Sequence, residues 1–242
     1  ACDGDVDFAV RLYRANKHWH GLFVEPSDRN YADIVDMLQT DRVIDRSTVI
    51  KAAVAGECPN PTLLFNSPNY DDFNETKDYP HWKRRQIGHI VTPDRPPEIM
   101  GPDEDKYWRL SLVKCITGTS VLNAWRTNRH LTHGDDHFRV HLLKIDIEGL
   151  EHVVLFNLLQ HPIQTHYSSS PNRVIHTGLE EWELPLMIVF ESKVFVEHAK
   201  NPIRLEESLT RLLVDRGYEI NVPIGRTVDV WAYLKPEKII HK

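Results

Sequence analysis

The chain has 242 residues, of which 41% are hydrophobic and 26% are charged, a composition typical of a globular protein with a full core. The formal net charge of −6 gives no electrostatic basis for binding nucleic acid or an anionic membrane, so neither partner is expected. No run approaches the roughly 18 apolar residues of a membrane helix, so no membrane contact is expected from the chain as given.

Cysteine usage and the first residue bear on the compartment. Cys2, Cys58 and Cys115 are widely spaced without a CxxC pair, which argues against a disulfide framework and a cysteine zinc site. This favours a reducing, cytoplasmic compartment. An Asn-x-Thr sequon at Asn74 leaves the secretory route open. The sequence starts at Ala1 without a methionine, so a removed signal or anchor would instead indicate the secretory-pathway lumen.

The first 65 residues alternate between helical and strand patterns. HGLFVE is a short apolar run closed by Glu25 and Pro26, as in a buried strand that stops at a loop. Ser27 or Asp28 can cap the helix that follows. The expected elements are a helix up to Asn16, a strand at His20–Glu25, a helix containing Tyr31, Ile34, Val35 and Leu38, and strands at Thr48–Val54 and Thr62–Phe65.

A proline-rich segment interrupts this pattern from Ser67 to Asp105. Structureless loops of this length are uncommon inside compact domains, so an inserted segment or lid is predicted. Its aromatic residues favour packing over disorder, either against the core or over a substrate.

A polar cluster, HLTHGDDH, follows a short helix predicted over Thr119–Trp125. It contains five potential metal ligands: His130, His133, Asp135, Asp136 and His137. Their spacing matches no regular metal motif such as HExxH, so a polar loop is favoured over a metal site. A divalent metal therefore remains an alternative that is not favoured.

The stretch HLLKIDIEGLEHVVLF, 141–156, predicts a strand, a turn and a helix. Asp146 and Glu148 lie at the carboxyl end of that strand, where ligands bind in open α/β sheets. The alternative is that these acids cap the helix and favour its positive end.

The remaining elements complete an α/β pattern. A buried strand is predicted at Pro185–Glu191, and a helix at Leu205–Asp215 with Gly217 as its stop. Tyr218–Val222 and Val228–Leu234 predict a closing antiparallel hairpin. Strands that alternate with helices indicate an α/β sheet with one antiparallel edge.

A glycine turn and a later acid predict a nucleoside site. Gly4 and Glu25 lie 25 − 4 = 21 positions apart, close to the roughly 20 residues that separate a glycine turn from a ribose-binding acid. A turn glycine and an exposed glutamate without a ligand are the alternative. Asp3 and Asp5 would repel a pyrophosphate, whereas S-adenosylmethionine carries no phosphate and is cationic at its ammonium and sulfonium groups. The charges therefore favour S-adenosylmethionine.

Several segments together resemble the FkbM family of S-adenosylmethionine-dependent methyltransferases. They are, in order, ACDGD, GLFVEPSDRNY, IKAAV, LLKIDIEGLEHVVL, PLMIVFES and LLVDRGYEI, of which KIDIEGLE is the most specific. The resemblance implies a Rossmann-like doubly wound sheet of the class I methyltransferase type in one domain, residues 1–242, with an antiparallel C-terminal hairpin and the 67–105 segment as an insertion. Two features depart from the family pattern: the first strand and glycine expected before Ala1 are absent, and Leu150 replaces an alanine.

The resemblance also implies site residues. Cys2, Asp3 and Gly4 would end the donor-binding turn, Glu25 would bind the ribose, and Ala52 and Ala53 would flank the adenine. Asp146 and Glu148 would face the methyl-transfer site.

Transfer to a hydroxyl needs a base, and Asp146, Glu148 or a histidine such as His133 could serve, as could Glu191 more weakly. The expected function is O-methylation of a sugar-like or small polar acceptor. The alternative is a catalytically inactive methyltransferase-like binding module, which the absent first strand and glycine would favour.

Overall fold

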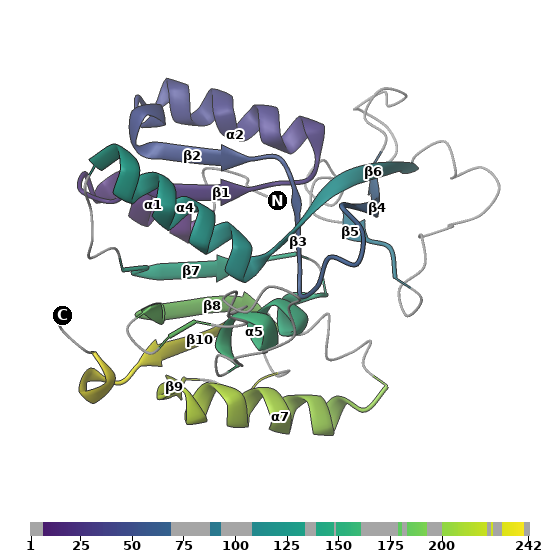
Figure 1. Ribbon diagram of the computed structural model, residues 1–242, viewed down its shortest axis with the longest axis vertical. Coiled ribbons are helices and arrows are strands. Elements are labelled where there is room, and N and C mark those ends of the chain that lie inside the picture. The colour runs from purple at the N-terminus through teal and green to yellow at the C-terminus, as the bar shows by residue number, and fades with distance from the viewer. Residues whose placement is uncertain are drawn as a thin grey trace, which may run out of the picture. The chain divides into compact units, whose positions relative to one another are not determined.

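The computed structural model describes residues 7–68, 88–92, 108–133, 139–147, 149–160, 179–180, 183–192, 200–221, 224 and 229–239. The backbone forms two compact units (Figure 1). The first contains Ala1–Val54 and Cys58–Ile116, and the second contains Ala55–Glu57 and Thr117–Lys242. The single domain expected from the sequence stays a prediction. Among the helices of the described ranges, none is long and apolar enough to cross a membrane.

The first unit begins with a helix–strand alternation that matches the sequence pattern. Its elements are α1 (Phe8–Ala15), β1 (Gly21–Val24), α2 (Asp28–Thr40), the 3-10 helix η1 (Ile44–Arg46) and β2 (Ser47–Ile50). β1 and β2 pair in parallel, with Gly21 opposite Ser47. Ser27 caps α2 by accepting the N–H of Asn30, which confirms one of the two predicted caps.

The core of this alternation is an apolar cluster around Tyr13, Ile34 and Leu38, with Phe23 and Val49 packed against it. Phe23 comes from β1 and Val49 from β2, so the helices and the paired strands share one core.

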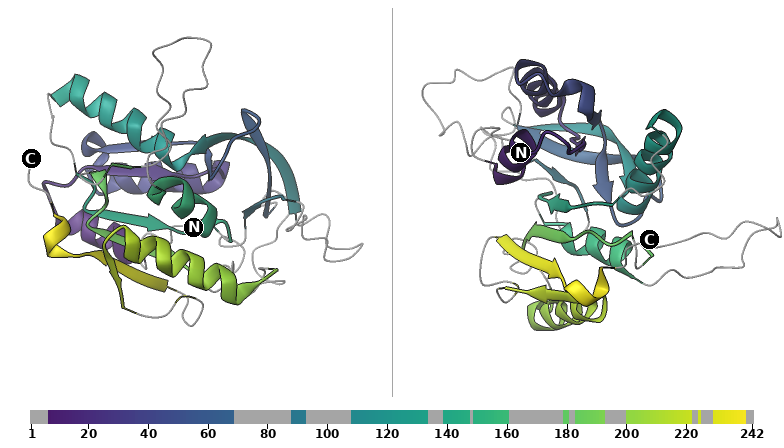
Figure 2. Two further views of the ribbon diagram at one scale, coloured as in Figure 1. Left: turned by 60° about the horizontal axis from the view of Figure 1, so that its bottom comes forward. Right: turned by 90° about the vertical axis from the view of Figure 1, so that its left-hand side faces the viewer.

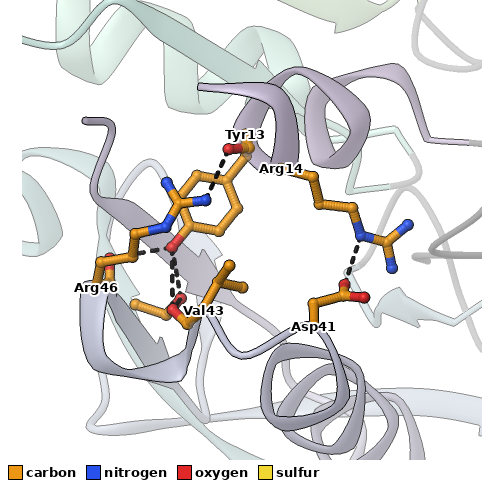
Figure 3. A network of polar contacts seen from close by, with 6 residues as sticks. Tyr13, Arg14, Asp41, Val43 and Arg46 are labelled. Atoms are coloured by element: carbon orange, nitrogen blue, oxygen red, sulfur yellow. Dashed lines mark hydrogen bonds and ion pairs between the residues drawn. The ribbon is translucent and has the colours of Figure 1, made fainter. Parts of the chain in front are cut away.

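Tyr13 and Arg46 form a polar network beside this core (Figure 3). The Arg46 guanidinium donates hydrogen bonds to the carbonyl oxygens of Asn16 (2.8 Å), Trp19 (2.7 Å) and Tyr13 (3.0 Å), and it lies 4.1 Å from the centre of the Tyr13 ring. The Tyr13 hydroxyl in turn donates to the carbonyl groups of Val43 and Arg46. Arg46 thereby pairs the carbonyl group of Tyr13 in the last turn of α1, which the helix itself leaves unpaired, and two carbonyl groups in the segment after the helix.

The rest of the first unit departs from the expected pattern. The strand expected over 48–54 is divided, because β2 ends at Ile50 and β3 covers Ala53–Ala55. Two further strands involve the proline-rich segment: β4 (Thr62–Pro68) runs into it, and β5 (His89–Ile90) lies within it. Residues 69–87 and 93–107 fall outside the described ranges. A ten-residue strand, β6 (Trp108–Thr117), was not predicted at all.

These strands form a four-stranded sheet with the order β3-β6-β4-β5. β4 pairs antiparallel with β6 from Thr62 opposite Lys114 to Pro68 opposite Trp108. This pairing brings Cys58 and Cys115 together in a disulfide, with 5.8 Å between their Cα atoms. The expectation that the cysteines form no disulfide is therefore wrong: the bond joins residues 57 positions apart, and only the β4–β6 pairing makes them neighbours.

The second unit is built on a four-stranded sheet. Its elements are α4 (Gly118–His133), β7 (Leu142–Ile145), α5 (Glu151–Leu159), β8 (Met187–Glu191), α7 (Pro202–Asp215), β9 (Tyr218–Ile220), β10 (Asp229–Leu234) and the 3-10 helix η4 (Pro236–Lys238). The strand order is β7-β8-β10-β9, as Figure 1 shows. β7 and β8 are parallel, whereas β10 is antiparallel to both β8 and β9. The α/β class and the closing antiparallel hairpin are confirmed.

Helices pack on this sheet through apolar stripes. α7 contacts β9 and α5 (Figure 2). α7 ends before Gly217, whose φ of 87° lies in the region that favours glycine, as the sequence predicts. The fully buried side chains include Leu155, Leu158, Leu159, Ile188, Phe190, Leu209 and Leu213.

α4 is longer than predicted and corrects the interpretation of HLTHGDDH. Residues 130–133 continue the helix instead of starting a polar loop. The buried residues Val121, Leu122, Trp125 and Arg129 recur at helical spacing, so the helical face extends to the start of the histidine cluster. Residues 134–138 lie outside the described ranges.

Candidate functional site

The ends of two neighbouring parallel strands bring acidic residues together in the second unit. In the β7–β8 register, Ile145 lies opposite Phe190. Asp146 follows Ile145, and Glu191 follows Phe190 as the last residue of β8. Parallel strands therefore present Asp146 and Glu191 at the same edge, the carboxyl edge at which α/β proteins bind ligands.

The turn after β7 accounts for four residues of the KIDIEGLE motif: Lys144, Asp146, Gly149 and Glu151. The Lys144 ammonium group lies 3.1 Å from an oxygen of Asp146, and both side chains are partly buried. Gly149 adopts a φ of 106°, which L side chains rarely adopt, so glycine is required there. Glu151 opens α5, and its carboxyl oxygens accept the N–H groups of Ile147 and Gly149, each at 2.9 Å.

Glu151 is completely buried although it is acidic. Burial raises the pKa of its carboxyl group from 4.5 to about 7; the hydrogen bonds from backbone N–H groups oppose that rise, and the charge of Glu191 adds to it. Near neutral pH, this carboxyl group is therefore divided between its protonated and charged forms.

Asp146, Glu151 and Glu191 offer carboxylate oxygens that all lie within 4.8 Å of one another. Three such oxygens are close enough to hold a divalent cation. However, both oxygens of Glu151 already accept backbone N–H groups, which accounts for its place in the cluster without an ion. The arrangement can polarise or deprotonate a hydroxyl group brought to the strand ends.

Asp146 does not cap α5 through a side-chain hydrogen bond. Leu150 occupies the N-cap position of α5, and no side chain forms a capping hydrogen bond there. Asp146 instead pairs with Lys144, as expected for an anchored acid. Glu148 lies outside the described residues.

Three of the predicted donor-binding residues, Glu25, Ala52 and Ala53, are buried in the first unit. Glu25 directly follows β1; it is 8% exposed and accepts the N–H of Ser27 at 2.9 Å. The hydrogen bond fixes the carboxylate at the carboxyl end of β1, and the alternative of an exposed glutamate is wrong. Ala52 and Ala53 are both 1% exposed, at the break before β3 and at its start.

The side chains of the remaining predicted site residues are not described by the structure. Cys2, Asp3 and Gly4 lie outside the described residues, as does the acid Glu148. His133 is the last residue of α4, and its side chain is not described.

The sequence interpretation gave Glu151 no role and ranked Glu191 below Asp146. A signal for Glu151 was present, because it lies on the buried stripe of α5 formed by Val154, Leu155, Leu158 and Leu159. An acid on an otherwise apolar helix face indicates a buried, hydrogen-bonded carboxyl group.

Comparisons with protein-family models, curated proteins and solved structures found no match to this chain.

Proposed function

We propose that the protein is an S-adenosylmethionine-dependent O-methyltransferase that acts on a hydroxyl group of a sugar-like or small polar acceptor. The observation that carries the proposal is the pair of acids, Asp146 and Glu191, at the carboxyl ends of two adjacent parallel strands. The KIDIEGLE resemblance and the antiparallel hairpin support a class I methyltransferase sheet.

Glu25 supports the donor half of the proposal. Its buried carboxylate, fixed by the Ser27 N–H, suits hydrogen bonds from ribose hydroxyl groups. S-adenosylmethionine supplies an activated methyl group, and the residues of the chain have to orient the acceptor and remove its proton.

Asp146 is the preferred base. It would take the proton as the acceptor oxygen bonds to the methyl carbon and the carbon–sulfur bond breaks. Lys144 holds Asp146 in place, and fixed orientation is a large source of rate in such transfers. Glu191 is the second candidate because it lies at the same strand edge.

Calorimetry with S-adenosylmethionine and its demethylated product tests donor binding. The variant Glu25→Gln should lose binding at least about tenfold, since a neutral amide cannot accept two charge-assisted hydrogen bonds. Asp28→Asn is the matched control, because Asp28 lies three residues away, changes the charge equally and is exposed. A folded sample that gives no heat with either ligand would overturn the proposal.

Methyl transfer to a panel of sugars and glycans then separates an enzyme from a binding module. Asp146→Asn should bind the donor normally but transfer at least about a hundredfold more slowly. Donor binding by the unaltered chain without transfer to any acceptor would favour the inactive module.

We also propose that the protein works in an oxidising compartment, such as the secretory-pathway lumen. The support is the Cys58–Cys115 disulfide, because such bonds are rare in reducing compartments. Mass mapping of the protein from its native source, with free thiols blocked at lysis, should recover the linked peptides. Fully blocked, unlinked Cys58 and Cys115 would contradict this assignment.

A further inference from the structure

The buried carboxyl group of Glu151 is placed to control the turn that precedes it. Its two oxygens accept the N–H groups of Ile147 and Gly149, each at 2.9 Å, so a single side chain ties two points of the turn. The side chain itself cannot move freely, because it is 0% exposed and lies on the apolar stripe of α5.

The residue at the N-cap position of α5 does not hold the turn through its side chain. The N-cap residue Leu150 makes no side-chain capping bond. Gly149 has a φ of 106°, and the absence of a Cβ atom leaves that residue the widest choice of backbone conformations. A turn with a glycine at its centre needs hydrogen bonds from outside the turn to hold one conformation, and Glu151 supplies two of them.

Asp146 lies immediately before this turn and is held on its other side by Lys144 at 3.1 Å. The direction of its carboxylate therefore depends on two anchors, the Lys144 ion pair and the backbone of Ile147. Movement of that backbone would redirect Asp146 without removing any group of the base.

We propose that Glu151 is a positioning residue: its buried carboxyl group holds the turn after β7 through the Ile147 and Gly149 N–H groups and so sets the direction of the Asp146 carboxylate towards the acceptor. The catalytic half of this inference rests on the proposed methyl transfer. The structural half, the two-point attachment of the turn, stands without it.

Variants that differ in the number of acceptor atoms test the attachment. Glu151→Gln keeps one acceptor oxygen and Glu151→Met keeps none, at similar length. Amide exchange resolved by NMR should show that the Gln variant loses protection at only one of Ile147 and Gly149. The Met variant should lose it at both, by roughly tenfold or more.

Kinetics of the same variants test the positioning. The kcat should fall about tenfold in the Gln variant and about a hundredfold in the Met variant, while the KM for S-adenosylmethionine stays within about twofold, because small displacements of a reacting group have effects of this size. Thr119→Val is the matched control. It removes the 2.9 Å hydrogen bond that the Thr119 hydroxyl of α4 donates to the Asn157 side chain, and Asn157 lies on α5 but away from the turn. Its kcat should stay within about twofold of the unaltered enzyme.

The outcomes separate the two proposals. Full protection of both amides in a folded Met variant would overturn the attachment. Lost protection with a kcat equal to that of Thr119→Val would overturn the positioning role. An unaltered chain that binds no donor and transfers no methyl group would overturn the proposed function and the catalytic half with it, and the amide data would still decide the attachment.

Discussion

Ionisation of Glu151 makes the stability of the second unit depend on pH in a direction opposite to that of most acids. An ion-paired carboxylate stabilises a fold as pH rises, but the pKa of Glu151 is raised by burial. The folded chain therefore retains a proton at Glu151 at pH values where the unfolded chain has lost it. Between these pKa values, stability falls as pH rises.

The size of the effect follows from the two pKa values. The rise from 4.5 to about 7 corresponds to about 3 kcal/mol at about 1.4 kcal/mol per tenfold change in proton affinity. This contribution is fully present below pH 4.5, declines between there and about pH 7, and is lost above that pH. It is an upper value, because local opening would let water reach the carboxylate.

Urea unfolding from pH 4.5 to pH 8 measures the contribution. Subtracting the curve of Glu151→Gln from that of the unaltered chain cancels the other titrating groups, because Gln does not ionise. The difference should fall by about 3 kcal/mol across this range. Glu207→Gln removes an exposed carboxyl group of α7 and is the control for the loss of a carboxyl group by itself. A flat difference for Glu151→Gln would refute the reasoning.

Three further perturbations have defined outcomes. Replacing Cys58 and Cys115 by serine should lower the free energy of unfolding by about 4 kcal/mol, the loop-closure value for residues 57 positions apart, whereas Cys2→Ser, which leaves the bond intact, should have little effect in the same urea titration. Arg46→Ala should lower stability by about 3 kcal/mol because three carbonyl groups lose a charged donor, and Arg46→Lys should recover only part of this by thermal unfolding. Methyl transfer should survive exhaustive EDTA treatment without a gain from added Mg²⁺ or Mn²⁺; activity that disappears and returns with metal would show that the reaction needs a cation.

Local patterns predicted most of the elements correctly. β1 ends before Glu25, α2 starts after the Ser27 cap, and α7 stops before Gly217, because each boundary is determined by residues close in sequence. The closing hairpin is likewise local, since β9 and β10 are neighbours in the chain.

The features that were missed depend on contacts between distant residues. β6 is recognisable only when β4 lies beside it, and the disulfide depends on that pairing. At the candidate site, the sequence identified Asp146 and the strand edge. It could not identify the contact of Glu191 with Glu151, because β8 starts 36 residues after Glu151 and only sheet pairing brings their ends together.

The Cys58–Cys115 bond also changes the covalent connectivity of the chain. It closes a ring that includes the whole segment from Cys58 to Cys115. Cleavage of any one peptide bond inside that ring leaves a single molecule, which would separate into two pieces only after reduction. The base of the ring is held by the β4–β6 ladder, so the sequence within it could change in length or be cut during maturation while both strands stay joined to the rest of the protein.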